Sequence, residues 1–305
     1  MKVEQHIPVM LEEAVDALAV TAGGRYVDGT FGRGGHSREI VRRGGTVLGI
    51  DRDEAAVAAA EGIPPPLRIP PPLKVVKGEH GNLKGIANEY GWKEVDGVLL
   101  DLGVSSPQLD EAGRGFSFLR EGPLDMRMDR SGGVTAAEIV NGWDEAELTR
   151  IFREYGEEPN ARRIAKAIAT RRGFETTKEL ADFIETTIGR RSGKHPATRV
   201  FQALRMEVND ELGELKRALE GGMELLKSGG RFAIITFESL SDRMVKEFFA
   251  AHVGKSVSLQ QGGAERVGEK PWAKAVTRKP VTAGEEELQR NPRARSAKLR
   301  VIEKE

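Results

Sequence analysis

Residues 27–36 read VDGTFGRGGH, and this stretch decides the fold. Its apolar start is typical of the end of a β-strand, its glycines allow a tight turn, and the residues that follow predict a helix. A second predicted strand, residues 46–50, leads into Asp51, which follows Asp28 by 23 residues. A carboxylate at about that spacing binds ribose hydroxyls in βαβ units. The stretch therefore predicts a nucleotide-type binding turn in a Rossmann-like sheet.

The acid at the start of this turn separates two classes of ligand. A dinucleotide places its pyrophosphate at the helix N-terminus and needs the spacing G-x-G-x-x-G, whereas this turn begins with Asp28 and Gly29 and has its other glycines at positions 32, 34 and 35. A carboxylate repels a pyrophosphate but attracts the sulfonium and ammonium groups of S-adenosylmethionine. The electrostatics favour that methyl donor. A glycine-rich turn without a ligand is the alternative, which the spacing of Asp51 disfavours.

Composition excludes several kinds of chemistry. The 305 residues allow about two domains, and 47 basic residues balance 47 acidic ones, so any RNA-binding surface must be a local patch. Cysteine is absent, which excludes disulfides, thiolate metal sites and the thiol nucleophile used to methylate carbon 5 of pyrimidines. We expect no metal, no signal peptide and no membrane span, and a cytoplasmic protein.

Further predicted strands at residues 73–76 and 95–100 are followed by His80 and Asp101. Strands alternate with predicted helices, which is typical of a parallel sheet that binds ligands at the carboxyl ends of its strands. The residues expected along this edge are Asp28, Asp51, His80 and Asp101.

A helical pattern then interrupts the sheet before a buried strand resumes at residues 231–237. We predict a discontinuous Rossmann-like domain, residues 1–110 and 207–305, and an all-helical insertion, residues 111–206, as an RNA-recognition domain. The proline-rich residues 62–72 are expected to form a stiff connector.

Three groups of basic residues are candidates for phosphate contact, although solvated helix faces are the common alternative. They comprise Arg162, Arg163, Lys166, Arg171 and Arg172; Arg190, Arg191, Lys194, His195 and Arg199; and Arg293, Arg295, Lys298 and Arg300.

The candidate catalytic residues follow the strand that ends at Asp101. An exocyclic amine conjugated to a ring is a poor nucleophile, so acceptors that bind its hydrogens favour the transition state of its methylation. Asp101 and Ser105 are our candidates for this role. In the alternative interpretation, Ser105 only forms a turn and Asp101 binds the donor's ammonium group, which is the stronger prediction for Asp101.

Several long strings resemble the bacterial small-subunit ribosomal RNA cytosine-N4 methyltransferase family (MraW/RsmH). They are residues 6–10, 28–36, 51–53, 101–110, 114–117, 122–128, 195–199 and 291–300. The resemblance covers nearly the whole chain and implies a class I S-adenosylmethionine-dependent methyltransferase fold with a helical insertion. It also implies methylation of N4 of a cytidine in the decoding region of the small subunit's 16S rRNA.

The resemblance also implies roles for individual residues. Residues 115–117 and 123–128 would lie near the RNA entrance, and the contacts to S-adenosylmethionine would come from Gly34, Gly35, His36, Asp51, His80, Asp101 and Gln108. The chain departs from the family pattern at three positions. His80 stands where the family usually has an apolar aromatic residue, Glu238 where it has histidine, and Ser241 where it has glutamate.

The expected reaction is a direct in-line displacement without a covalent enzyme intermediate. Two other functions stay open at this point: an NAD-dependent oxidoreductase on the same fold, and a ribosome-assembly factor that keeps the donor pocket without catalysis.

Overall fold

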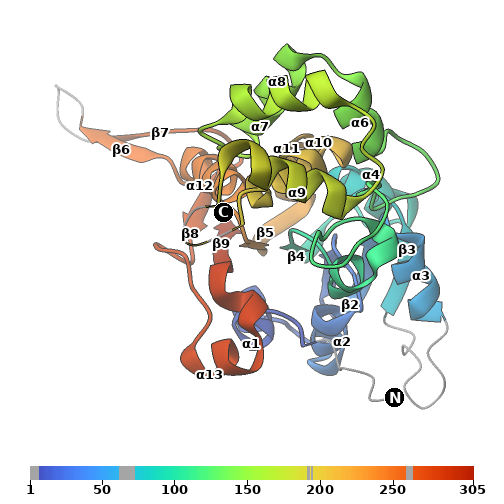
Figure 1. Ribbon diagram of the computed structural model, residues 1–305. Coiled ribbons are helices and arrows are strands. Elements are labelled where there is room, and N and C mark those ends of the chain that lie inside the picture. The colour runs from blue at the N-terminus through green and yellow to red at the C-terminus, as the bar shows by residue number, and fades with distance from the viewer. Residues whose placement is uncertain (1–6, 62–72, 191–192, 194, 259–263) are drawn as a thin grey trace. The chain divides into compact units, whose positions relative to one another are not determined.

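The computed structural model describes residues 7–61, 73–190, 193, 195–258 and 264–305 (Figure 1). It divides into two compact units: Met1–Gly103 with Gly213–Glu305, and Val104–Leu212. The sequence placed these boundaries after residues 110 and 206. The proline-rich residues 62–72 lie outside the described residues.

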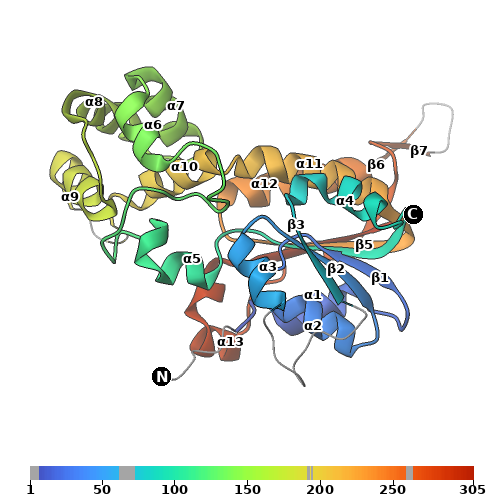
Figure 2. The same ribbon diagram turned by 90° about the vertical axis from the view of Figure 1, so that its right-hand side faces the viewer.

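The first unit is built on a seven-stranded sheet with the order β3-β2-β1-β4-β5-β9-β8 (Figure 2). The strands from β3 to β5 are parallel, whereas β9 runs antiparallel to both β5 and β8. The strands are β1 (Arg25–Asp28), β2 (Thr46–Asp51), β3 (Leu73–Lys77), β4 (Val95–Asp101), β5 (Leu226–Thr236), β8 (Ala273–Ala275) and β9 (Lys298–Lys304). The predicted Rossmann-like sheet is confirmed.

Helices cover both faces of this sheet. They are α1 (Leu11–Leu18), α2 (Gly35–Arg42), α3 (Glu54–Glu61), α4 (Leu83–Glu89), α11 (Glu211–Leu225) and α12 (Ser239–Val253). Figure 2 shows α1 and α2 on one side and α4, α11 and α12 on the other. Successive residues of each strand enter opposite cores: Val98 and Leu100 pack with α4, α11 and α12, while Leu99 packs with α1 and α2. Both faces are thus buried, so polar ligand groups can enter only at the strand ends.

Helix α1 is limited to eight residues, because Met10 and Ala19 adopt left-handed φ values of 51° and 50° at its ends. Residues 227–230 belong to β5, which begins directly after α11. Val95 pairs with Leu226, and a register shift before Gly97 accommodates the extra residues.

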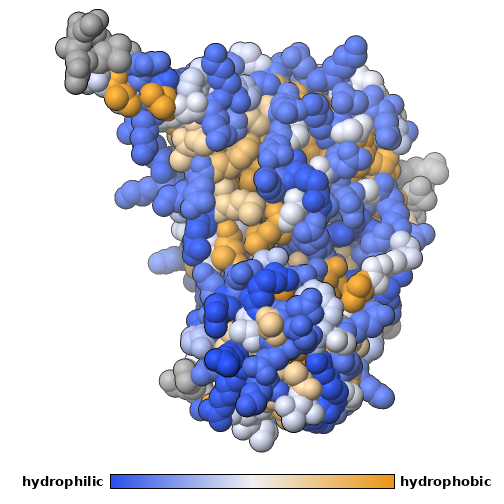
Figure 3. Space-filling view, turned by 90° about the horizontal axis from the view of Figure 1, so that it is seen from above, coloured by the Kyte–Doolittle hydropathy of each residue, from blue (hydrophilic) through white to orange (hydrophobic). Residues whose placement is uncertain are grey.

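A short two-stranded hairpin, β6 (Lys255–Ser258) and β7 (Ala264–Val267), connects α12 to the sheet edge. It projects from the sheet unit and carries exposed apolar residues, Val257 and Val267 (Figures 1 and 3). At its base, Arg266 stacks on Trp272 and donates to the carbonyl oxygen of Ala273. These contacts fix the hairpin to the sheet unit.

The second unit is helical and has its own core. Its elements are α5 (Ser106–Asp110), η2 (Ala112–Arg114), α6 (Ala136–Gly142), α7 (Glu145–Glu154), α8 (Ala161–Arg171), α9 (Thr177–Ile188) and α10 (Thr198–Val208). Phe152, Phe174 and Leu180 are among its fully buried side chains. Thr176 caps α9 by accepting the N–H of Glu179. Across both units, the described helices include none with the length and apolar character that a membrane span requires.

Candidate active site

Three neighbouring parallel strands each end in an aspartate. Asp28 ends β1, Asp51 ends β2 and Asp101 ends β4, with β1 between the other two. The short helix η1 (His80–Asn82) follows β3. Because the carboxyl ends of parallel strands meet at one edge of a sheet, all four predicted residues lie along the same edge.

The turn after β1 is fixed to both neighbouring strands. The N–H of Gly32 donates to Oδ2 of Asp51 at 2.7 Å, and the N–H of Asp101 donates to Oγ1 of Thr30 at 2.6 Å. A Cβ at Gly29 would lie 2.5 Å from a leucine side chain of β4, so only glycine fits there. Gly34 adopts φ +70° at the start of α2. The turn is therefore held against the ends of β2 and β4.

Asp28 links the turn after β1 to helix α2. Its side chain is buried and accepts hydrogen bonds from the Ser37 hydroxyl at 2.6 Å and from the N–H of Thr30 at 3.2 Å. It therefore joins the turn to the first turn of α2. Sequence reasoning did not single out Thr30 or Ser37, although both lie in or directly beside the deciding stretch.

The three carboxyls share an electrostatic property. Burial raises the pKa of Asp28, of Asp51 and of Asp101 to about 6 in each case. Within the described residues, none of the three forms an ion pair with a lysine or arginine. The edge is thus a concentration of desolvated negative charge that a cationic ligand would neutralise.

Asp101 has an unused acceptor. Its Oδ1 is buried and makes no hydrogen bond to any described residue, and its Oδ2 lies 3.9 Å from Nδ1 of His36. Nε2 of His36 is 3.0 Å from the carbonyl oxygen of Val9. Because a carbonyl only accepts, Nε2 carries the proton and fixes the ring. An ammonium group at Oδ1 would satisfy the orphan oxygen, so the edge fits the amino-acid end of S-adenosylmethionine.

His80 supplies a neutral ring at the same edge. Burial lowers the pKa of His80 to about 4, although the carboxylate of Glu214 acts in the opposite direction. Its Nε2 is buried without a hydrogen-bond partner among the described residues. The Cβ of His80 would lie 3.3 Å from a Cβ at Gly29, which places the ring beside the turn. An uncharged imidazole there can stack on a purine or bond to one of its nitrogens.

Ser105 and Gln108 belong to the helical unit. Ser105 is the N-cap of α5, and its N–H donates to Oε1 of Gln108 at 2.9 Å. Gln108 is buried. Both residues thus stabilise the start of α5. The role of Ser105 as an acceptor for the target amine and that of Gln108 as a contact to the methyl donor stay predictions.

Two carboxylates at this edge have roles that the sequence did not reveal. Glu238 is the N-cap of α12, directly after β5, and accepts the N–H of Ser241 at 3.1 Å. Glu287, in α13 (Glu285–Arg290), accepts the N–H of Met10 at 2.7 Å and adds to the raised pKa of Asp101. Glu287 lies 186 positions after Asp101, and no local pattern relates the two residues.

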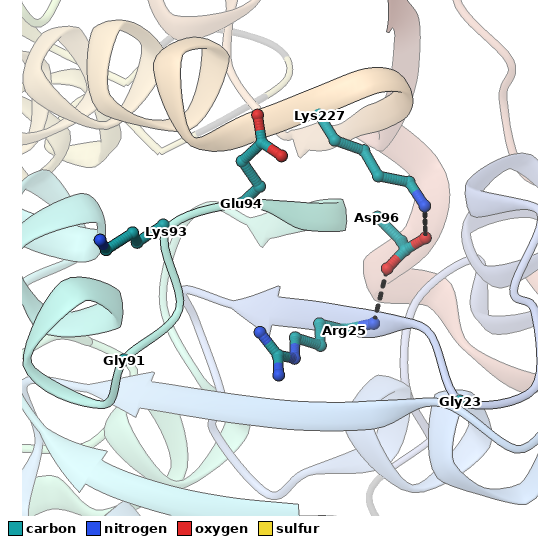
Figure 4. Close-up of a pocket in the computed structure, with 7 residues that line it drawn as sticks. All are labelled: Gly23, Arg25, Gly91, Lys93, Glu94, Asp96 and Lys227. Atoms are coloured by element: carbon teal, nitrogen blue, oxygen red, sulfur yellow. Dashed lines mark hydrogen bonds and ion pairs between the residues drawn. The ribbon is translucent and has the colours of Figure 1, made fainter.

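A separate shallow cavity lies at the opposite, amino-terminal ends of β1 and β4 (Figure 4). Its lining residues are Gly23, Arg25, Gly91, Lys93, Glu94, Asp96 and Lys227. Asp96 there pairs with Lys227 and accepts the N–H of Arg25 at 2.8 Å. Because its carboxylate already has a cation, this cavity lacks the uncompensated charge of the other edge.

The predicted basic groups are largely neutralised. Ion pairs join Arg162 to Glu145, Arg171 to Glu179, Arg190 and His195 to Glu185, and Lys298 and Arg300 to Asp242. Arg172 donates to two carbonyl oxygens, and Arg191 and Lys194 lie outside the described residues. Of the three predicted groups, the cations that remain exposed without a carboxylate partner in the described structure are Arg163, Lys166, Arg199 and Arg295.

Comparison with known proteins decides the family. The model of the MraW methylase family matches residues 3–305. The chain belongs to this family. It is 49% identical to a ribosomal RNA small subunit methyltransferase H of Acetivibrio thermocellus, over 98% of this chain and 99% of that one. The protein of the same name from Symbiobacterium thermophilum is 47% identical, over 98% and 96%.

The predicted family is therefore confirmed, and with it the methyl donor, S-adenosylmethionine. Membership of this methylase family favours methyl transfer over the hydride transfer of an oxidoreductase. The orphan oxygen of Asp101 and the uncompensated carboxylates are the structural features that suit this cationic donor.

Asp101→Asn should stabilise the protein without donor and remove donor binding. Because the pKa of Asp101 in the folded protein is about 6 and lies above its ordinary value of 3.8, the folded wild type holds this proton more tightly than the unfolded chain. That contribution is complete below pH 3.8 and is lost as the pH rises through 6. We expect a gain of about 1–3 kcal/mol at pH 7.5 that shrinks toward pH 4, measured by chemical denaturation. S-adenosylmethionine should no longer raise the Tm.

Asp96→Asn, at the other end of β4, is the matched control. Burial acts to raise the pKa of Asp96, but Lys227 and the N–H of Arg25 lower it overall. This variant should be destabilised and should keep its donor-induced rise in Tm. Destabilisation by Asp101→Asn at pH 7.5, or unchanged donor binding, would contradict the role of Asp101.

Proposed function

We propose that this protein transfers a methyl group from S-adenosylmethionine to the exocyclic N4 amine of a cytidine in the decoding region of small-subunit 16S rRNA, in the cytoplasm. The row of desolvated carboxylates without cationic partners is the observation that supports S-adenosylmethionine as the methyl donor. The relatives' name, ribosomal RNA small subunit methyltransferase H, supports the substrate half. The N4 position rests on the resemblance of the sequence motifs.

The sheet edge holds the donor through several residues. Asp101 takes the ammonium group with its free Oδ1, Asp51 takes the ribose hydroxyls, and His80 packs on the adenine. The donor site is lined at the start of α2 by the backbone of Gly34, Gly35 and His36. When bound, S-adenosylmethionine supplies a methyl group on a positively charged sulfur. Gln108 is the further donor contact that we assign from the helical unit.

Methyl transfer requires an amine held in line with the carbon–sulfur bond. The cytidine N4 lone pair forms the new carbon–nitrogen bond, the carbon–sulfur bond breaks with its electron pair left on sulfur, and the amine then loses a proton to solvent or a nearby acceptor. The conjugated amine must become tetrahedral, so acceptors for its hydrogens lower the barrier. Ser105 is our candidate acceptor from the chain, with Asp101 as the second candidate. The absence of cysteine agrees with a mechanism that needs no covalent enzyme intermediate.

Purified protein, tritiated S-adenosylmethionine and small subunits from cells that lack this protein test the assignment. We expect label in one cytidine, recovered as N4-methylcytidine by mass spectrometry of the nucleosides. Subunits from cells that contain the protein are the control and should accept no label, because their site is already methylated. Label at carbon 5, or on a substrate other than the small subunit, would refute the proposal.

The remaining alternative, a non-catalytic assembly factor, has a different signature. Such a protein would bind S-adenosylhomocysteine, seen as a rise in Tm, and would leave the subunits unlabelled.

We assign RNA phosphate contact to the exposed, unpaired cations of the helical unit. Arg163 and Lys166 lie one turn apart on α8, and Arg199 lies at the start of α10. Each cation that contacts a phosphate releases counterions and steepens the dependence of affinity on salt.

The double variant Arg163→Gln, Lys166→Gln should therefore weaken RNA binding and flatten its dependence on salt. We expect the slope of log affinity against log salt to decrease in magnitude by about 1.4–1.8, measured by filter binding between low and physiological salt. Lys178→Gln is the control, because Lys178 pairs with Asp182 in the folded protein and its loss should leave the slope unchanged. An unchanged slope in the double variant would remove α8 from the interface.

A further inference from the structure

One apolar side chain of the helical unit is presented to solvent. Leu119 is 86% exposed, the highest value among the large hydrophobic residues of the described structure. It lies in residues 117–122, which are part of the connection between η2 and α6. A flexible loop could turn such a side chain inward, so its exposure has meaning only if the loop is fixed.

The residue before Leu119 is held by ring packing. Phe118 lies 4.7 Å from the ring of His195 and 4.9 Å from that of Phe201, between ring centroids. It packs against the core of the helical unit. The N–H of Leu119 itself donates to Oγ of Ser117 at 3.2 Å. The backbone that enters the loop tip is thus anchored.

The residues after Leu119 are tied to α9. The buried Thr177 donates its N–H to the carbonyl oxygen of Gly122 at 2.8 Å and its hydroxyl to that of Arg120 at 3.3 Å. A Cβ at Gly122 would lie 1.8 Å from the carbonyl oxygen of Ala112, so the backbones approach closely there. With both flanks fixed, Leu119 is held outward at the tip of a rigid loop.

The surroundings favour a nucleic acid over a protein as its partner. The neighbouring Arg120 donates to the carbonyl oxygen of Asp110 at 2.6 Å and forms no ion pair with a carboxylate in the described structure. In the described part of the helical unit, the one other exposed large hydrophobic residue is Val134, at 47%. A protein interface buries about 800 Å² on each partner, whereas a single leucine beside a cation is sufficient to enter one base step of a nucleic acid.

We propose that Leu119 is a wedge that enters a base step of the substrate RNA and helps to unstack the cytidine that is methylated. This inference rests on the proposed function. Enzymes that modify a base must take it out of its stack, and a rigid aliphatic side chain inserted in its place lowers the cost of unstacking. The wedge acts on the RNA conformation, so it is a positioning residue and takes no part in the chemical step.

Two RNA probes separate this role from simple contact. The first is a stem–loop of the target region with the methylated cytidine paired, and the second is the same RNA with that cytidine opposite an abasic site. Leu119→Ala should lower kcat/KM about tenfold on the paired RNA and less than about twofold on the unpaired one. Leu119→Met, which keeps a long apolar side chain, should retain most of the activity on both.

Val134→Ala is the matched control, since it shortens the other exposed apolar side chain of the same unit. It should leave both rates unchanged. An equal loss on the two RNAs with Leu119→Ala, or no loss on either, would overturn the wedge.

A fluorescence measurement keeps the two proposals distinguishable. With 2-aminopurine placed beside the target cytidine of the paired RNA, the wild type should raise the fluorescence on binding, and Leu119→Ala should raise it less. If the wild type methylates neither RNA, the proposed function fails, and the fluorescence still decides whether Leu119 unstacks the base. An identical rise for both proteins would contradict the wedge.

Discussion

The structure depends on three desolvated carboxylates that share one sheet edge without a cation. Burial shifts the pKa values of Asp28, Asp51 and Asp101 upward together, so the folded chain without ligand carries an electrostatic cost at neutral pH. Elsewhere the same chain pairs its acids readily, as Asp96 does with Lys227 and Asp242 with Lys298 and Arg300. At the sheet edge, by contrast, these three carboxylates have no lysine or arginine partner in the described structure. A positively charged methyl donor is the ligand that such an edge would bind.

The packing of the sheet explains how the folded protein tolerates this electrostatic cost. The parallel strands are buried on both faces, so their ends are held by two cores rather than by the site itself. The turn after β1 donates the N–H of Gly32 to the Asp51 carboxylate and accepts the N–H of Asp101 at the Thr30 hydroxyl, which fixes the strand ends before any ligand arrives. Because the groups of such a site are already ordered, little free energy is lost in ordering them when the ligand binds. The rigid loop that presents Leu119 follows the same principle in the helical unit.

Local patterns made the donor edge predictable from the sequence. Residues 27–36, Asp51 and Asp101 all follow short apolar strands, and parallel strands bring such ends together whatever the details of packing. What escaped prediction depends on partners distant in sequence. Glu287 reaches Met10 from the other end of the chain, and strands β9 and β8 join the sheet beyond β5 by long-range antiparallel pairing. The basic groups were overestimated for the same reason, because their neutralising acids, such as Asp242, cannot be located from spacing alone.

The most direct test of this account is the titration of the carboxyls themselves. In protein labelled with carbon-13 at aspartate side chains, NMR can follow Asp28, Asp51 and Asp101 through pH with and without S-adenosylmethionine. We expect pKa values near 6 in the free protein and a fall of the Asp101 pKa to or below its ordinary value when the donor is bound. Ordinary values in the free protein, or values that do not move on addition of the donor, would contradict it.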